Sequence, residues 1–182
     1  MPLTPSAARE LIHTRSIIIH GYLRADGLYD IEGHLTDVKT RDMTLTVGVR
    51  KAGEPIHEMW LRITIDKRLN IVAAEAQSDA MPYPGHCDKI TPKYQQLVGL
   101  SLLPGFTAKV RDIFGGVEGC THITELIGKV ATTAYQTLAG EVKLPEHMKP
   151  FQLDKCHALV TDGPAVAKYY PRWHRGAKIQ AG

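Results

Sequence analysis

The chain has 182 residues, a length that fits one domain or one domain with an extended arm. Its 22 lysines and arginines against 19 aspartates and glutamates give a formal charge of +3, which falls short of the dense basic surface of a nucleic-acid-binding protein. No apolar run approaches the roughly 20 residues that a membrane span needs, and residues 1–15 lack the apolar core of a secretory signal. The three cysteines are widely spaced and odd in number, which argues against a disulfide framework. We therefore expect a soluble, cytoplasmic protein with no nucleic-acid or membrane partner.

The first half of the chain predicts an antiparallel sheet. Residues 16–24 and 28–38 alternate between apolar and polar side chains, as half-buried strands do, and residues 25–27 between them have the composition of a tight turn. The register that keeps like faces together pairs Tyr22 with Asp30 across this turn. Further strands are expected over 43–50, 56–65 and 69–76. The connections between the strands are short, which predicts a meander of four or five antiparallel strands.

The second half of the chain changes to helical spacing. Short helices are expected over 92–99 and 106–114, and a long helix over 121–139. Prolines and glycines scattered through 141–182 predict a mostly irregular C-terminal arm. The predicted fold class is α+β, an antiparallel meander sheet with helices packed on one face. The predicted single domain, 1–182, comprises in order a sheet at about 15–78, a helical part at about 89–140 and the arm.

Six ionisable side chains of the first two strands are expected on one face of the sheet: His20, Tyr22, Arg24, Asp30, Glu32 and His34. Such a set offers a base, an acid and groups that stabilise an anion. A solvated sheet face is polar as well, so the same residues also fit a surface without a function. Within residues 33–37, strand alternation puts His34 and Asp37 on opposite faces, so only one of them can join a given cavity.

His57 lies on the apolar face of the strand expected over 56–65, beside Met59. A lone histidine in such a place is typical of a hydrogen-bonded core residue, and it also fits a catalytic base. Trp60 and Arg62 are expected on the opposite face of the same strand, away from His57.

Cys120 and His122 stand at the start of the long predicted helix. The free amides and partial positive charge of a helix N-terminus favour a thiolate and a neutral imidazole. This pair fits a nucleophile, a metal-ligand pair or a base. Cys120 also fits the plain role of a small buried hydrophobe.

Three neighbouring pairs of histidine and cysteine supply enough soft ligands for a zinc site: His86-Cys87, Cys120 with His122, and Cys156-His157. No pair has the spacing of a structural zinc motif, and the sequence contains neither a glycine-rich phosphate loop nor a nucleophile elbow. We therefore expect no metal and no other cofactor, with a zinc site as the alternative.

Four segments of the chain, taken together, resemble a bacterial family, domain of unknown function 2889. They read HGYLRADGLYDIEGHLTDVK, AGEPIHEMWLRITID, GCTHITELI and LDKCHALVTDGPAVAKYYPRW, and the resemblance covers about 15–173. The family is in turn similar to small cofactor-independent lyases that remove formaldehyde from lignin-derived aromatic dimers and leave stilbenes. Residues 40–50 depart from the resemblance, which leaves substrate contacts in that loop open.

The resemblance implies a carbon–carbon lyase of aromatic compound catabolism that works by general acid/base chemistry. A base, His57 or His34, would take the proton of a hydroxymethyl group, and formaldehyde would leave as the electrons return to a quinone methide. The catalytic candidates that it implies are His57, His34, Glu32, Tyr22, Arg24, Arg62, His122 and Asp37. The substrate-binding candidates are Asp26, Tyr29, Met59, Trp60 and Cys120.

Two readings from other classes remain open. A zinc-bound water held by the three histidine–cysteine pairs would hydrolyse an ester or thioester. Alternatively, the polar sheet face would bind an aromatic ligand or a partner protein without chemistry. An acyl ligand is a further alternative for that face, and the small-molecule partner expected overall is an aromatic substrate. A homodimer is also expected, because the C-terminal arm looks suited to wrapping a second chain and burying Tyr169, Tyr170 and Trp173.

Overall fold

The computed structural model describes residues 4, 6–141 and 148–176. Contacts along the chain divide it into two compact units, Met1–Glu141 and Val142–Gly182. The first unit holds the sheet and the longer helices, and the second holds only short helical turns. The organisation of the chain as one domain stays a prediction.

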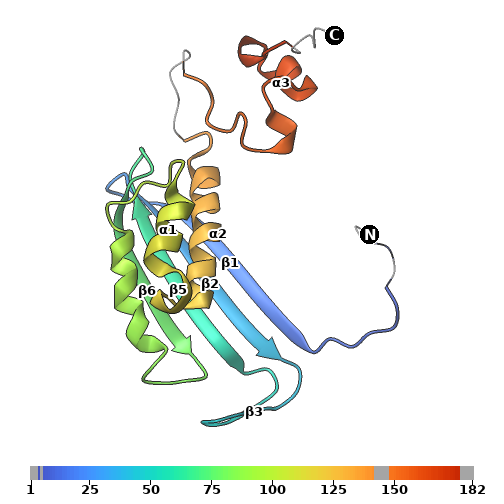
Figure 1. The fold of residues 1–182 in the computed structure, drawn as a ribbon, viewed down its shortest axis with the longest axis vertical. Helices are drawn as coiled ribbons and strands as arrows, with labels where there is room; N and C mark the ends of the chain where they lie inside the picture. Colours follow the sequence, from blue (N-terminus) through green and yellow to red (C-terminus); the bar gives the residue numbers. More distant parts are fainter. Residues whose placement is uncertain (1–3, 5, 142–147, 177–182) are drawn as a thin grey trace. The chain divides into compact units, whose positions relative to one another are not determined.

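The first unit is built on a four-stranded antiparallel sheet in the order β1-β2-β5-β6, which follows the chain as a meander (Figure 1). Its strands are β1 (His13–Leu23), β2 (Tyr29–Lys39), β5 (Pro55–Ile65) and β6 (Ile71–Ala80). The predicted register is confirmed, because Tyr22 lies opposite Asp30. The turn between β1 and β2 places Gly27 at φ 81°, a left-handed conformation that glycine adopts without strain.

The prediction of a single strand over 43–50 is wrong. This segment folds back on itself as a separate hairpin of β3 (Met43–Leu45) and β4 (Gly48–Arg50). The chain reverses between the two strands, where Gly48 has φ 130°. A local hairpin therefore replaces a strand of the main sheet, which has four strands.

The helices of the first unit cover one face of the sheet (Figure 1). α1 (Phe106–Phe114) matches its prediction, and α2 (Thr121–Leu138) packs against β1, β2 and β5. The short helix predicted over 92–99 is instead the longer 3-10 helix η1 (Asp88–Leu97), which contains Pro92 rather than beginning at it. The α+β class is confirmed.

Short helical segments make up the rest of the described chain. η2 (Gly116–Glu118) joins α1 to α2, and the second unit contains η3 (His157–Leu159), α3 (Pro164–Tyr169) and η4 (Pro171–Trp173). The second unit is thus the C-terminal region of short turns that was expected. No helix in the described part of the chain is long and apolar enough to cross a membrane. The predicted homodimer stays a prediction.

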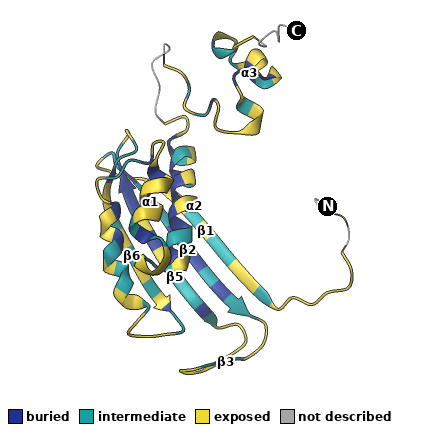
Figure 2. Cartoon of the chain, viewed as in Figure 1, coloured by how far each residue is buried: buried dark blue, intermediate teal, exposed yellow. Residues whose placement is uncertain are grey.

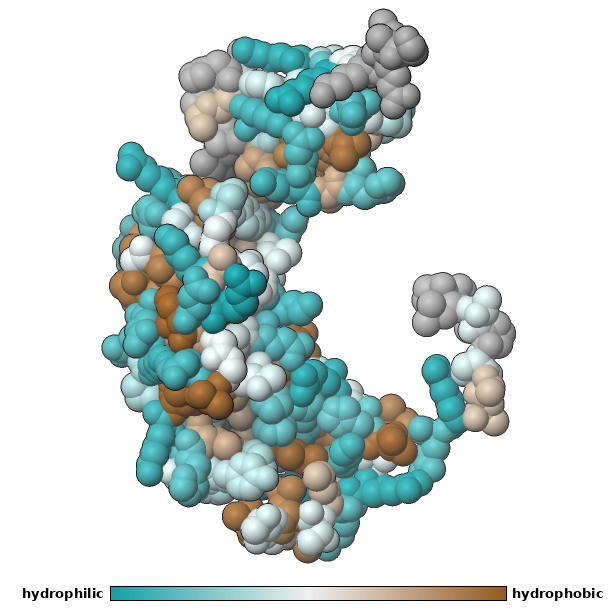
Figure 3. All heavy atoms as spheres, viewed as in Figure 1, coloured by the Kyte–Doolittle hydropathy of each residue, from teal (hydrophilic) through white to brown (hydrophobic). Residues whose placement is uncertain are grey.

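The core of the first unit lies between the sheet and α2. Figure 2 shows buried residues alternating with less buried ones along β2, as expected for a strand with one covered face. Opposite them, α2 presents its apolar stripe of Ile123, Leu126, Ile127, Val130 and Ala134. On the outer surface of the helices, polar residues are interspersed with apolar ones (Figure 3).

Two glycines let α2 approach the sheet closely. A Cβ on Gly33 of β2 would lie 2.8 Å from Val130 Cγ2, and one on Gly21 of β1 would collide with Thr137. The absence of these two side chains fixes the distance of α2 from the strands. It thereby allows the first turn of α2 to lie close to the ends of the strands.

Candidate functional site

Polar side chains from three strands and from α2 meet at one end of the helix-covered face. We call them the Asp37 cluster: His13 and Arg15 of β1, Asp37 of β2, His57 of β5, and Cys120, His122 and Glu125 at the start of α2. The sheet register brings the strand residues of the cluster together, because Arg15 lies opposite Asp37 and Asp37 lies opposite His57. The first turn of α2 supplies the rest.

Asp37 is the centre of the cluster and is only 1% exposed. Arg15 donates to both of its oxygens, Nε to Oδ1 at 2.9 Å and Nη2 to Oδ2 at 2.8 Å. His13 Nε2 lies 3.1 Å from Oδ1, and His57 Nδ1 lies 3.1 Å from Oδ2. A buried carboxylate is stable only when it is paired and hydrogen-bonded in this way.

The surroundings of Asp37 keep it ionised. Burial alone would raise the pKa of Asp37, but the hydrogen bonds and charge of Arg15, together with His57 and His13, hold that pKa below its ordinary value. The same contact raises the pKa of Arg15. The pair is therefore a fixed charge pair at neutral pH.

His57 and His122 form a stacked pair beside this carboxylate, with ring centroids 3.8 Å apart. Burial lowers the pKa of His57 and outweighs the opposite effect of Asp37. Burial also lowers the pKa of His122, and the neighbouring His57 lowers it further. Both rings are consequently neutral at neutral pH, the state in which an imidazole accepts a proton.

The contact with Asp37 selects the tautomer of His57. A proton on Nδ1 donates to the carboxylate, so Nε2 is the ring nitrogen that carries the free lone pair. His57 is 19% exposed and His122 is 21% exposed, which leaves their ring edges accessible while Asp37 stays buried. A third histidine of the cluster has an unpaired ring nitrogen. His13 Nδ1 is buried and has no hydrogen-bond partner among the described residues.

The start of α2 is held by a tyrosine from η1. Tyr94 is completely buried, and its hydroxyl accepts a hydrogen bond from the Cys120 amide at 2.8 Å. The same hydroxyl lies 3.0 Å from Thr124 Oγ1 and 3.1 Å from the Cys120 carbonyl oxygen. Since no side chain of α2 caps its N-terminus, Tyr94 does so from another element. It thereby positions Cys120 and His122.

Asp37, His57 and His122 are also the only group of three potential metal ligands in the described chain, with ligand atoms within 4.8 Å of one another. Two histidines and one carboxylate are a known ligand set for transition metals. A metal ion there would compete with Arg15, which already occupies both oxygens of Asp37. Of the six residues predicted to bind zinc, only His122 belongs to this group.

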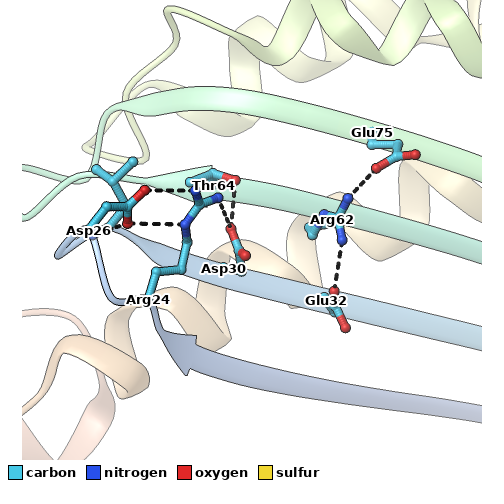
Figure 4. Close-up of polar contacts among 8 residues, drawn as sticks. Arg24, Asp26, Asp30, Glu32, Arg62, Thr64 and Glu75 are labelled. Carbon is cyan, nitrogen blue, oxygen red and sulfur yellow. Dashed lines mark hydrogen bonds and ion pairs between the residues drawn. The ribbon is translucent and has the colours of Figure 1, made fainter.

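The other predicted site residues lie on the opposite, outer face of the sheet and in its first turn. They are Tyr22, Arg24, Asp26, Glu32, His34, Trp60 and Arg62. Four of them, Arg24, Asp26, Glu32 and Arg62, belong to two ion-paired groups that Figure 4 shows. In the first group, Arg24 binds both oxygens of Asp26 and contacts Asp30. In the second, Arg62 bridges Glu32 and Glu75.

An open hollow of about 350 Å³ lies on this outer face beside Arg62 and Trp60. Arg62, Glu32 and Glu75 are ion-paired there and largely exposed, so each pair contributes little energy. Asp79, which also lines the hollow, accepts hydrogen bonds from Trp60 and Gln77. His34 stacks on Trp60 at 3.7 Å, with Nε2 3.0 Å from Glu58 Oε1. We therefore place the candidate site at the Asp37 cluster and not at the hollow.

Two of the proposed substrate-binding residues are part of the core. Tyr29 is 3% exposed and Met59 is 1% exposed, both beneath the helices. The structure thus brings together Asp37, His57, His122 and Cys120, and it separates them from the seven outer-face residues. The prediction that only one of His34 and Asp37 faces a given cavity is confirmed, since Asp37 joins His57.

Three residues of the cluster were not predicted as site residues: His13, Arg15 and Glu125. The strand was predicted to begin at residue 16, whereas β1 begins at His13. Every second residue of a strand lies on the same face, so His13 and Arg15 share a face with Ile17 and Ile19. Extending the predicted strand back to residue 13 would have placed both side chains on the covered face.

Comparison with protein families identifies one match. The model of a family described as "Protein of unknown function (DUF2889)" matches residues 13–136, more than half of the chain. All members of the Asp37 cluster lie within this match. Neither the curated proteins nor the solved structures contain a match to the chain.

Proposed function

The chain belongs to the family of proteins of unknown function DUF2889, and we propose that it is an acid/base enzyme in which His57 is the general base. The observation that carries this proposal is the hydrogen bond between His57 Nδ1 and the buried, ionised Asp37. A carboxylate in this position holds the imidazole in one tautomer and stabilises the imidazolium that forms when Nε2 takes a proton.

The proposed reaction is that of a cofactor-independent lyase that releases formaldehyde from a phenolic aromatic dimer and leaves a stilbene. It needs one base that gives and takes protons repeatedly. His57 takes the phenol proton. It gives this proton to the aryl-ether oxygen as the bond between that oxygen and carbon breaks, and a quinone methide remains. His57 then takes the hydroxymethyl proton, the carbon–carbon bond breaks, and the electron pair returns to the ring. The resulting phenolate recovers the proton.

The surroundings of His57 suit these steps. Arg15 offsets the negative charge of Asp37 and Glu125, which limits their repulsion of a phenolate that forms beside His57. His122 lies in contact with the ring of His57. The substrate class itself rests on the sequence resemblance.

The test is an assay on phenolic lignin-type dimers that carry a hydroxymethyl group, with no added cofactor. Formaldehyde is quantified together with stilbene absorbance. Equal release of both by the native protein is expected, and His57→Gln should lower the rate by about 10²–10⁴-fold. His20→Gln, on the exposed outer face, is the matched control and should keep the native rate.

His34→Gln tests the other face of the sheet in the same assay. A loss of turnover in this variant, with His57→Gln unaffected, would overturn the assignment of the base. Absence of product across the panel, with binding of the dimers retained, would favour the reading of a ligand-binding protein.

A second candidate is metal-dependent hydrolysis of an ester or thioester at the same cluster. The approach of ligand atoms of Asp37, His57 and His122 to within 4.8 Å favours it. Its test is the metal content of the purified protein, with ester turnover before and after chelator dialysis. Stoichiometric metal together with turnover that is lost on chelation and restored by zinc would select this function over the lyase.

A further inference from the structure

We propose that Cys120 is a nucleophile that accepts an acyl group from an activated ester or thioester, with His122 as its base. Cys120 Sγ lies 3.9 Å from His122 Nδ1, and Nε2 of the same ring lies 3.6 Å from Asp37 Oδ2. Thiol, imidazole and carboxylate thus follow one another in the order that activates a cysteine. This activity goes beyond the proposed lyase, which uses neither the thiol nor Nδ1 of His122.

The backbone at Cys120 is held in place by contacts to η1 and α1. Tyr94, from η1, binds the amide and the carbonyl of Cys120 through its buried hydroxyl. On the preceding residue, a Cβ at Gly119 would lie 2.5 Å from the Phe114 carbonyl oxygen, so only glycine fits there. Cys120 is also partly exposed, so a small reagent can reach it.

The charges around Cys120 suit an acyl-transfer step. Cys120 is the residue that precedes the 18-residue helix α2, whose first amides are donors suited to a tetrahedral oxyanion. Arg15 lies on the other side of His122 and offsets the charge of Asp37. The remaining acidic group, Glu125, is bound by Arg15 Nη1 at 2.7 Å.

The proposed step is balanced without a further reactant. Cys120 Sγ attacks the acyl carbon, a carbon–sulfur bond forms, and His122 Nδ1 takes the thiol proton. The bond from carbon to the leaving oxygen or sulfur breaks, and the leaving group receives that proton. Water then attacks the thioester on Cys120, the carbon–sulfur bond breaks, and the thiol regains a proton as the carboxylic acid leaves.

The experiment uses the full chain and p-nitrophenyl acetate, with released p-nitrophenolate and the mass of the intact protein followed together. A burst of about one p-nitrophenolate per chain is expected, accompanied by one acetyl group on the peptide that contains Cys120. Cys120→Ala should abolish the burst and the adduct. Cys87→Ser and Cys156→Ser, which remove the other two thiols, are matched controls and should retain both.

His122 is tested with two variants, Ala and Asn, whose folding is checked by circular dichroism. Each should slow the acetylation of Cys120 by about 10²–10⁴-fold. Equal labelling of all three cysteines, or an unchanged burst in Cys120→Ala, would overturn the nucleophile. An unchanged rate in both folded His122 variants would overturn the base. The readout is a covalent adduct, so its failure is distinguishable from a failure to release formaldehyde.

Discussion

Arg15 binds both oxygens of Asp37 through Nε and Nη2 and donates to Glu125 through Nη1, so a single guanidinium joins β1, β2 and α2. This contact keeps the Asp37 carboxylate ionised. Without Arg15, the buried carboxylate would be partnered only by histidines, whose charge depends on pH. With it, Asp37 stays ionised while both neighbouring imidazoles stay neutral.

Arg15→Lys is expected to weaken both stability and the proposed turnover. A lysine ammonium is a point charge and cannot reproduce two parallel hydrogen bonds to one carboxylate. Because Arg15 is itself 37% exposed, we expect a loss of about 1–2 kcal/mol in the free energy of unfolding. Urea denaturation measures this. Arg41→Lys, at an exposed ion pair with Glu10, is the control and should change stability little.

Stability should fall on acidification, beginning just below pH 6.5. The folded-state pKa values of His57 and His122 lie below the ordinary value of 6.5, so the unfolded chain binds more protons there and stability rises with pH. Asp37, whose pKa is lowered from 3.8, adds a further loss as the pH drops below about 4.

The measurement for this pH dependence is the urea midpoint between pH 4 and 8. His57→Gln combined with His122→Gln should flatten the profile between about pH 5 and 6.5, because the titrating rings are gone. A native profile that rises as the pH falls through this range would contradict the neutral state that we assign to both rings.

The alternation of the strands was enough to predict which residues share a face. It placed His57 with Met59 and away from Trp60, and it separated His34 from Asp37, as the structure shows. These predictions succeeded because a strand repeats every two residues and a slip of one residue would expose the core. The candidate residues of both faces were therefore known, but the site itself was not.

The junction between α2 and the strand ends was beyond sequence reasoning. Helical spacing predicts which face of α2 is buried, but it does not say how far along the sheet the first turn lies. The close approach of α2 at Gly21 and Gly33 contributes to this placement, and the sequence does not reveal what a glycine faces. Arg15 was missed for a different reason. Residues 13–15 are all polar, so the strand was predicted to begin only at residue 16 and its alternation was not extended back to Arg15.

Tyr94→Phe should destabilise the start of α2 and alter the reactivity of Cys120. Removing the hydroxyl leaves the Cys120 amide without its acceptor, at a cost of about 1–3 kcal/mol in the free energy of unfolding. The rate of Cys120 alkylation by iodoacetamide should change as well, because the backbone that positions the sulfur is released. Tyr83→Phe, at an exposed tyrosine, is the control. Alkylation unchanged in a destabilised Tyr94→Phe would limit Tyr94 to a structural role.

Gly33→Ala is expected to push α2 away from the sheet and to lower stability by about 1–3 kcal/mol. The new methyl group would lie 2.8 Å from Val130 Cγ2 and 3.3 Å from Leu126 Cδ2, and both residues are completely buried. Gly128→Ala is the matched control, because nothing lies within 4 Å of a Cβ on this exposed face of α2. It should instead raise stability by about 0.5–1 kcal/mol through helix propensity.

The double variant Gly33→Ala, Val130→Ala decides whether contact with α2 is the cause of the Gly33 effect. Val130→Ala alone leaves a cavity and costs stability, whereas in the double variant the new methyl group enters part of that space. The two losses measured by urea denaturation should therefore sum to more than the loss of the double variant. Strict additivity would show that Gly33 is needed for a reason other than the approach of α2. It would also remove the argument that these glycines place His122 beside Asp37.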